Sequence, residues 1–316
     1  MLGPVLLSTV LSFHGSTLPA VNVQTNGGMY YTAVLNSGPV AQKYDIVFIG
    51  DGFTSSDQAA FNAAVDDALA ALQGLPPYSQ RMCAFNIWRV NVVSSESGVD
   101  HPAQGVFRNT ELDCRFGNPS NGEAERCITS DSPLKCIEAA DYAPDHDAIF
   151  VLVNDTEWGG CAGGLVFSSI APGFHDIITH ELGHKIGALA DEYDCYVCDG
   201  SDNDRSYSGA EPMAVNLTKD TNRTTTKWSA LIASTTAIPT TVNSPPGVVG
   251  LWEGGGYFRF GIYRPQSSCH MRDLAPFCAV CADAMLVKLQ GRCTLCELNP
   301  SSYFCWSDDW RPIRPI

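Results

Sequence analysis

Basic residues are scarce in this sequence. Lys and Arg number 19 against 34 Asp and Glu, which gives a formal net charge of −15 at pH 7. Proteins that bind nucleic acid or an anionic membrane surface need clusters of positive charge, because those partners are polyanions. The composition therefore argues against both classes of partner.

Long apolar runs and repeats are absent as well. The stretch Pro4–Phe13 resembles the apolar part of a signal peptide, but no Lys or Arg precedes Lys43, so the positively charged leader of such a peptide is missing. No run reaches the roughly 20 residues of a membrane span, and we find no internal repeat, heptad pattern or low-complexity tract. With 316 residues, 45% apolar and 17% charged, the chain is typical of one large globular catalytic domain with insertions.

Cysteine, in contrast, is abundant, with 13 residues. Thiols at this density are prone to oxidation and would serve little purpose in a reducing compartment. A secreted or extracytoplasmic location is therefore favoured. Glycosylation sequons begin at Asn154, Asn216 and Asn222, and they matter only if the source glycosylates its proteins.

The cysteine spacing leaves two interpretations open. C-x-x-C pairs suit a structural zinc ion as well as disulfide bonds; the pairs are Cys195/Cys198, Cys278/Cys281 and Cys293/Cys296. Since the other cysteines are scattered, we expect disulfides in preference to a second, structural zinc ion on these pairs. The odd total leaves at least one cysteine without an intramolecular partner, and Cys83 is a candidate.

The chain divides into three segments by composition. Residues 1–42 are rich in small and polar residues and are predicted to form a leader or a few edge strands, residues 43–290 carry the pattern of a catalytic domain, and residues 291–316 form a cysteine-bearing tail. Within the domain, the cysteine-containing stretch 95–143 is expected to be a disulfide-tied insertion. From residue 195 to 268 the chain is loop-rich, with a helical stretch around Trp228–Ile232.

Apolar periodicity predicts strands and helices in the catalytic segment. Strands are expected at Tyr44–Ile49, Phe85–Val93 and Asp147–Asn154, and a closing helix at Phe277–Leu289. The predicted fold class is α/β (α+β), with a mixed twisted sheet and an active-site helix.

The turn Gly50-Asp51-Gly52 connects the first strand to an alanine-rich helix that extends to about Leu72. Ser55 or Ser56 is expected to cap this helix, and Asp51 to hold the turn by accepting hydrogen bonds from backbone amides. The glycines match no phosphate-binding motif, so we exclude a nucleotide loop.

The stretch "HELGH" carries the clearest chemical pattern. His180 and His184 lie four residues apart, so on a helix they are about 40° from each other on one face and can bind one metal ion. Glu181 is rotated by about a quarter turn and can approach a water on that ion without binding it. Zinc lowers the pKa of such a water, and Glu181 is the predicted general base.

A catalytic zinc ion needs a third protein ligand. Gly187 ends the predicted helix three residues after His184, so the chain can turn back under the metal, as in zinc peptidases of the metzincin clan. The commonest metzincin spacing would place the third ligand at Ala190, which cannot bind metal. We therefore expect Asp191 in this role, with Glu192 as the alternative.

Two more residues could bind the metal, and one could support it. His175 is a minor alternative ligand, and Glu211 is the candidate third ligand of a thermolysin-like peptidase, although it precedes Pro212 in a loop. Metzincins also place a methionine in a tight turn beneath the metal. Met271 in "SSCHMRD" is the candidate for this Met-turn, with an ordinary core methionine as the alternative.

Five stretches of the chain resemble the IgA peptidase family of metzincin-like zinc metallopeptidases. They occur in the expected order over residues 44–290: "YDIVFIGDGFTSSD", "FNIWRVNVVSSESGVDHP", "DAIFVLVND" with "WGGCAGG", "HELGHKIGALADEY", and "CHMRD" with "FCAVC". The resemblance implies a zinc endopeptidase of protein or peptide substrates, with one zinc ion on His180, His184 and an acidic residue at 191 or 192, and Met271 in the turn. It does not imply the substrate, and immunoglobulin cleavage is not carried over.

Contacts to the substrate and to the oxyanion are less well defined. Gly159 and Gly160, in the glycine-rich stretch Trp158–Gly164, are candidates for an edge along which an extended substrate lies, with a loop pinned by Cys161 as the alternative. Tyr193, Tyr263 and Arg272 are candidate helpers at the oxyanion. A catalytically weak or inactive binding protein on the cell exterior remains the alternative function, and the oligomeric state is open.

Overall fold

The computed structural model describes residues 21–25, 28, 30–195, 205–294 and 298. Its centre is a six-stranded mixed sheet in the order β1-β3-β2-β6-β8-β7, in which β3, β2, β6 and β8 are parallel and the edge strands β1 and β7 are antiparallel to their neighbours. The strands are β1 Thr32–Asn36, β2 Tyr44–Asp51, β3 Phe85–Val90, β6 Ala148–Val153, β7 Gly160–Ala162 and β8 Val166–Ser169. The predicted mixed α/β fold is confirmed.

The central strands are buried on both faces, as their continuous apolar runs predict. In β2, Ile46 and Phe48 belong to one hydrophobic cluster while Val47 and Ile49 belong to another, because successive side chains point to opposite faces of the sheet. Phe48 also stacks on Phe150 of β6, with ring centroids 5.3 Å apart.

Three long helices contribute to the first of these clusters and a short one to the second. The three are α1 Gln58–Gly74, α3 Phe174–Gly187 and α5 Ala279–Gln290, and the short one is α2 Pro133–Ala140. The predicted helix starts at Ser55 and Ser56 are wrong: α1 begins at Gln58, with Asp57 at its N-cap. The Asp57 carboxylate instead accepts hydrogen bonds from the amide and hydroxyl of Thr54 in the preceding turn.

The insertion between β3 and β6 contains a two-stranded sheet of β4 Cys114–Phe116 and β5 Ile128–Ser130, followed by α2. A disulfide joins Cys127 to Cys161 beside β8 and so ties the insertion to the main sheet. Cys114 and Cys136 are buried free thiols. The insertion is therefore disulfide-tied as predicted, through one bond among its described cysteines.

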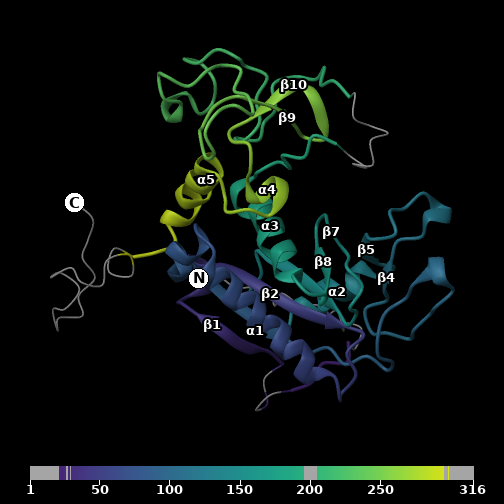
Figure 1. Ribbon diagram of the computed structural model, residues 1–316. Coiled ribbons are helices and arrows are strands. Elements are labelled where there is room, and N and C mark those ends of the chain that lie inside the picture. Colours follow the sequence, from purple (N-terminus) through teal and green to yellow (C-terminus); the bar gives the residue numbers. More distant parts are fainter. Residues whose placement is uncertain (1–20, 26–27, 29, 196–204, 295–297, 299–316) are drawn as a thin grey trace, which may run out of the picture.

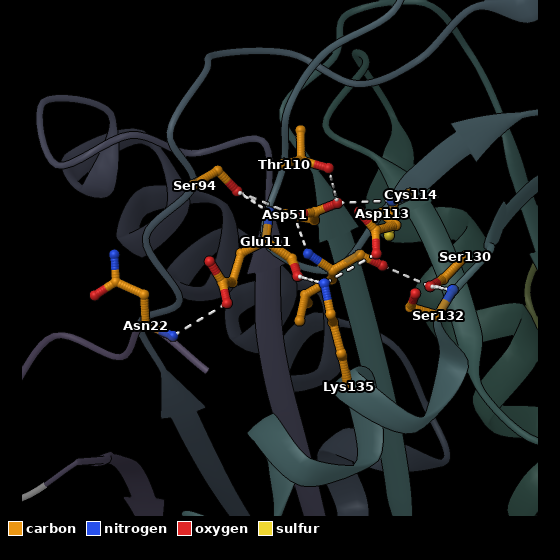
Figure 2. A network of polar contacts seen from close by, with 11 residues as sticks. Asn22, Asp51, Ser94, Thr110, Glu111, Asp113, Cys114, Ser130, Ser132 and Lys135 are labelled. Atoms are coloured by element: carbon orange, nitrogen blue, oxygen red, sulfur yellow. Dashed lines mark hydrogen bonds and ion pairs between the residues drawn. The ribbon is translucent and has the colours of Figure 1, made fainter. Parts of the chain in front are cut away.

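Asp51, at the end of β2, anchors this insertion (Figure 2). Its fully buried carboxylate accepts hydrogen bonds from the amides of Leu112 and Cys114, both at 2.9 Å, and from the hydroxyls of Ser94 and Thr110 at 3.0 and 2.8 Å. The prediction that Asp51 bonds amides is right in kind but wrong in place, because the amides belong to the insertion and not to its own turn.

The chain after α3 is loop-rich, as predicted. It contains the hairpin of β9 Trp252–Gly255 and β10 Phe258–Arg264, the short helix α4 His270–Asp273, and then α5. The stretch around Trp228 forms only a 3-10 turn. The 3-10 helices are η1 Val40–Gln42, η2 Tyr78–Ala84, η3 Pro102–Gln104, η4 Pro119–Asn121 and η5 Ser229–Leu231. Figure 1 shows α3 and α4 between the central sheet and the part that carries β9 and β10.

The disulfide pattern differs from the C-x-x-C expectation for two of the three pairs, Cys293/Cys296 and Cys278/Cys281. Cys83 is bonded to Cys293, so Cys83 is not the unpaired cysteine and Cys293 does not pair with Cys296. Cys195 is disulfide-bonded, whereas Cys278 and Cys281 are free thiols. Cys198 and Cys296 lie outside the described residues. Within the described residues, no helix is both long enough and apolar enough to span a membrane.

Candidate metal centre

His180 and His184 project from one face of α3, and each ring is held by a backbone carbonyl. Nδ1 of His180 donates to the carbonyl of His270 at 2.9 Å, and Nδ1 of His184 donates to the carbonyl of Leu189 at 2.7 Å. A carbonyl can only accept, so Nδ1 carries the proton and, in the neutral ring, Nε2 keeps a free lone pair. Both rings are therefore oriented as metal ligands are, with the second nitrogen fixed by a hydrogen bond.

The two Nε2 atoms converge on one carboxylate oxygen. Asp191 Oδ1 lies 2.9 Å from His180 Nε2 and 3.3 Å from His184 Nε2. Burial alone would raise the pKa of Asp191, but hydrogen bonds from the two imidazoles, whose Nε2 atoms donate when the rings are protonated, hold the pKa below its ordinary value. Two imidazole nitrogens and a carboxylate oxygen form a donor set that suits zinc, so these residues fit the ion that the sequence predicts.

Glu192, the second candidate for third ligand, turns away from the histidines. Its carboxylate is fully buried, where Oε1 accepts from Asn216 Nδ2 at 3.0 Å and contacts Cys281 Sγ at 3.3 Å. Glu211 pairs with Lys227 at 3.3 Å, and His175 has a side chain that is 42% exposed next to Asp176. The geometry therefore favours Asp191.

Glu181 lies beside this group without joining it. Its Oε2 is 3.8 Å from His184 Nε2, is buried, and has no hydrogen-bond partner among the described residues. Burial raises the pKa of this carboxyl above its ordinary value, against the lowering effect of the two histidines. A buried, unpaired carboxylate oxygen next to candidate metal ligands is suited to accept a proton from a water molecule.

The turn that returns Asp191 to the histidines begins at Gly187, where α3 ends as predicted. The helix ends at Gly187, but the residue in the left-handed conformation is Ala188, with φ 49°. A Cβ at Gly187 would lie 2.8 Å from Leu189 and 3.0 Å from Met285. Gly187 is thus needed for close packing beneath the turn, and not for a positive φ.

Met271 is fully buried on α4, directly against α3. A Cβ at Gly183 would lie 2.9 Å from the Met271 sulfur atom. The sulfur therefore packs against α3 at a residue that lies between His180 and His184 in the sequence. The Met271 carbonyl accepts from the amide of Glu192 at 2.8 Å. This contact connects the α4 segment to the chain that carries Asp191.

Two residues of this centre were not predicted. Tyr257, in the β9–β10 turn at φ 69°, donates its hydroxyl proton to Asp191 Oδ2. Asn216 is fully buried and clamps Ala190, with its side chain bonding both the amide at 2.9 Å and the carbonyl at 2.8 Å. A tyrosine that follows three glycines gives no sequence signal for such a role, and neither does a single asparagine in a polar loop. The burial of Asn216 also makes its sequon inaccessible to a glycan in this fold.

The three residues predicted to assist at the oxyanion all contact other residues of the protein. Tyr193 stacks on His180 with centroids 6.0 Å apart, and burial raises the pKa of Tyr193 to about 12. Arg272 donates to the Glu192 carbonyl at 2.9 Å and pairs with Asp194 at 3.3 Å, and Tyr263 packs against the core from β10. Of the three oxyanion candidates, Tyr193 is therefore the one whose ring contacts a candidate ligand.

Of the two predicted substrate glycines, Gly160 is the first residue of the edge strand β7 and Gly159 is the residue before it. A Cβ at Gly159 would lie 2.5 Å from the Phe116 ring and 2.8 Å from the Arg126 carbonyl, which explains the glycine by packing. The Gly160 amide donates to that same carbonyl at 3.0 Å. The β7–β8 hairpin is tied to α3, because Lys185 donates to the carbonyls of Gly163 and Gly164 in its turn, at 2.7 and 2.9 Å.

Comparison with known proteins identifies one family. The family model described as IgA Peptidase M64 matches residues 32–245. The match includes β1, which precedes the first stretch of resemblance, and ends before the segment of Met271. No curated protein matches the chain.

Proposed function

Because the chain belongs to the IgA peptidase M64 family and is therefore a peptidase, we propose that it is a zinc-dependent endopeptidase whose centre is formed by His180, Glu181, His184 and Asp191. The observation that supports this is the convergence of both Nε2 atoms on Asp191 Oδ1, at 2.9 and 3.3 Å, beside the unpaired Glu181 carboxylate.

His180, His184 and Asp191 would hold the ion. Bound zinc supplies Lewis acidity, which lowers the pKa of water at the site and polarises the carbonyl of the scissile bond. The chain itself supplies preorganisation: the carbonyls of His270 and Leu189 fix the two rings, and Tyr257 holds the far oxygen of Asp191. Such supporting hydrogen bonds keep ligands in place without a cost at each turnover.

Glu181 would move the proton. Its Oε2 accepts a proton from the attacking water and then returns it to the leaving amine, so the same carboxyl acts first as base and then as acid. Its burial beside the histidines keeps the carboxylate unpaired until substrate and water arrive.

The substrate is a protein or peptide of unspecified sequence. We propose that it lies extended along β7. The Gly159 carbonyl accepts from the amide of Ser169 and the Gly163 amide donates to the carbonyl of Leu165, so in the alternating antiparallel pattern Gly160 and Ala162 direct their backbone groups away from β8. The outward amide of Gly160 is already used by Arg126, so pairing would begin at Ala162. The two defined disulfides support the proposal that the enzyme works outside the reducing cytosol.

The first experiment measures the zinc content of the purified chain beside that of a His184→Ala variant. Removal of one imidazole ligand should abolish zinc binding at the catalytic site. In parallel, a peptide library is incubated with wild type and with Glu181→Gln, which should keep the zinc and lose about 10²–10⁴-fold in kcat. If His184→Ala keeps the full zinc content, the proposed centre is wrong. If zinc binds but wild type cleaves no peptide, an inactive binding protein becomes the better interpretation.

A further inference from the structure

A second group of metal-ligating side chains lies next to the candidate centre. It consists of Glu192, Cys269, Cys278 and Cys281, which we call the cysteine cluster. One ligand atom from each lies within 4.8 Å of the other three. Cys278 is 2% exposed and the other three are fully buried, so solvent does not satisfy these groups.

The three cysteines are free thiols, and two of their sulfur atoms accept hydrogen bonds from backbone amides. The Cys278 amide donates to Cys269 Sγ at 3.3 Å, and the Cys281 amide donates to Cys278 Sγ at 3.5 Å. Cys278 is the N-cap of α5, where the positive end of the helix dipole favours a thiolate. Amide donors of this kind orient sulfur ligands around a metal.

The carboxylate of Glu192 is only half satisfied. Oε1 has two partners, Asn216 and Cys281, but Oε2 is buried without a partner among the described residues. Arg264 acts on this carboxylate only from a distance, because its guanidinium donates to the carbonyls of Glu253 and Gly254 and forms no ion pair with Glu192. A buried carboxylate oxygen without a partner is costly, and a cation in the cluster would remove that cost.

We propose that the cysteine cluster binds one zinc ion through three thiolates and the Glu192 carboxylate, as a structural site separate from the catalytic one. Sulfur ligands select zinc over the hard cations Ca²⁺ and Mg²⁺, and four protein ligands leave no open position for a substrate. The C-x-x-C pair at 278 and 281 thus combines with Cys269 and Glu192, and not with another C-x-x-C pair.

The position of the cluster gives the ion its task. Glu192 directly follows Asp191, and its amide bonds the carbonyl of Met271 at 2.8 Å. Cys269 lies two residues before Met271, and Cys278 and Cys281 begin α5. The ion would therefore join the segment of Asp191, the segment of Met271 and α5, which holds Asp191 facing the two histidines.

Metal analysis of the full-length chain and single variants tests this. Wild type should contain about two zinc ions per chain, and His184→Ala about one. After exchange with Co²⁺, His184→Ala should still show thiolate-to-cobalt charge-transfer absorption, which a histidine and carboxylate site cannot give. Cys281→Ser should lose that absorption. Cys136→Ser is the matched control, since Cys136 is also a buried free thiol but lies outside the cluster, and it should keep both ions.

Thiol mapping of wild type keeps the test independent of whether Cys281→Ser folds. After denaturation with a chelator and without a reductant, alkylation should modify Cys269, Cys278 and Cys281 in full. A disulfide between any two of them, or a cobalt form of His184→Ala without thiolate absorption, would overturn the proposal. A failure of the catalytic proposal looks different: the thiolate absorption stays while peptide cleavage is absent.

Discussion

At the scale of single residues, the catalytic proposal depends on how firmly Asp191 is held. Asp191 follows a left-handed Ala188 and a turn that Asn216 clamps on both sides of Ala190. Tyr257 then fixes the oxygen that does not face the histidines. Each of these contacts comes from a different part of the chain, so the ligand is positioned by the folded structure and not by its local sequence.

Tyr257→Phe isolates one of these contacts. The change removes only the hydroxyl that donates to Asp191 Oδ2, and the loss of such a supporting hydrogen bond typically costs about 10–100-fold in metal affinity. We expect this weakening in a competition titration with a chelator, with an unchanged melting temperature for the metal-free form. Tyr207→Phe is the control, because its hydroxyl donates to the Ala210 carbonyl away from the centre. Equal zinc affinity in both variants would show that Tyr257 does not position the ligand.

Asp51→Ala tests a structural carboxylate. It would leave the buried amides of Leu112 and Cys114 without an acceptor (Figure 2). Each unsatisfied donor costs about 1–3 kcal/mol, so the free energy of unfolding in urea should fall by at least about 2 kcal/mol. Asp66→Ala is the control, since its side chain is 66% exposed, 3.8 Å from Arg89, and its effect should stay within about 1 kcal/mol. Comparable losses in the two variants would contradict the anchoring role of Asp51.

At the scale of elements, a glycine that packing requires directly precedes β7, whose edge a substrate could use. Gly159→Ala would drive a methyl group into the Phe116 ring at 2.5 Å and the Arg126 carbonyl at 2.8 Å. Overpacking of this kind typically costs about 1–3 kcal/mol, so we expect a lower melting temperature. Gly163→Ala, in the same hairpin with open space around its Cβ, should leave the melting temperature unchanged. A Gly159→Ala variant with normal stability and a raised KM would instead favour substrate contact.

The same scale shows what the sequence could predict. Strands β2, β3 and β6, helices α1 and α5, and the candidate ligand pair on α3 followed from periodicity and spacing, because each depends on its own residues. The edge strand β7 and its neighbour β8 were missed because three or four residues carry no periodicity. β9 and β10 were missed because their pairing around Gly255 and Gly256 interrupts any alternation. The cysteine cluster was missed for another reason: Glu192 and Cys281 are 89 residues apart, and only the fold brings them to 3.3 Å.

At the scale of the whole molecule, the two halves of the chain are joined by a covalent bond as well as by packing. The Cys83–Cys293 disulfide connects the segment before β3 to the chain that follows α5 across 210 residues, whereas Cys127–Cys161 closes only 34. The bond also lies near Arg292, whose guanidinium contacts the ring of Tyr44 at 5.2 Å. The end of the catalytic segment is thus returned to the first strands of the sheet.

Loop length predicts how much each disulfide stabilises the fold. In the chain-entropy description, a disulfide stabilises by restricting the unfolded chain, and the gain rises with the logarithm of the loop it closes. Replacing both Cys83 and Cys293 by Ala should therefore lower the free energy of unfolding by about 1.5 kcal/mol more than replacing both Cys127 and Cys161. Urea unfolding of the two double variants, with zinc in excess, measures this difference. If removal of the Cys127–Cys161 disulfide lowers the free energy of unfolding as much or more, this bond stabilises chiefly through the folded insertion that it ties to β8.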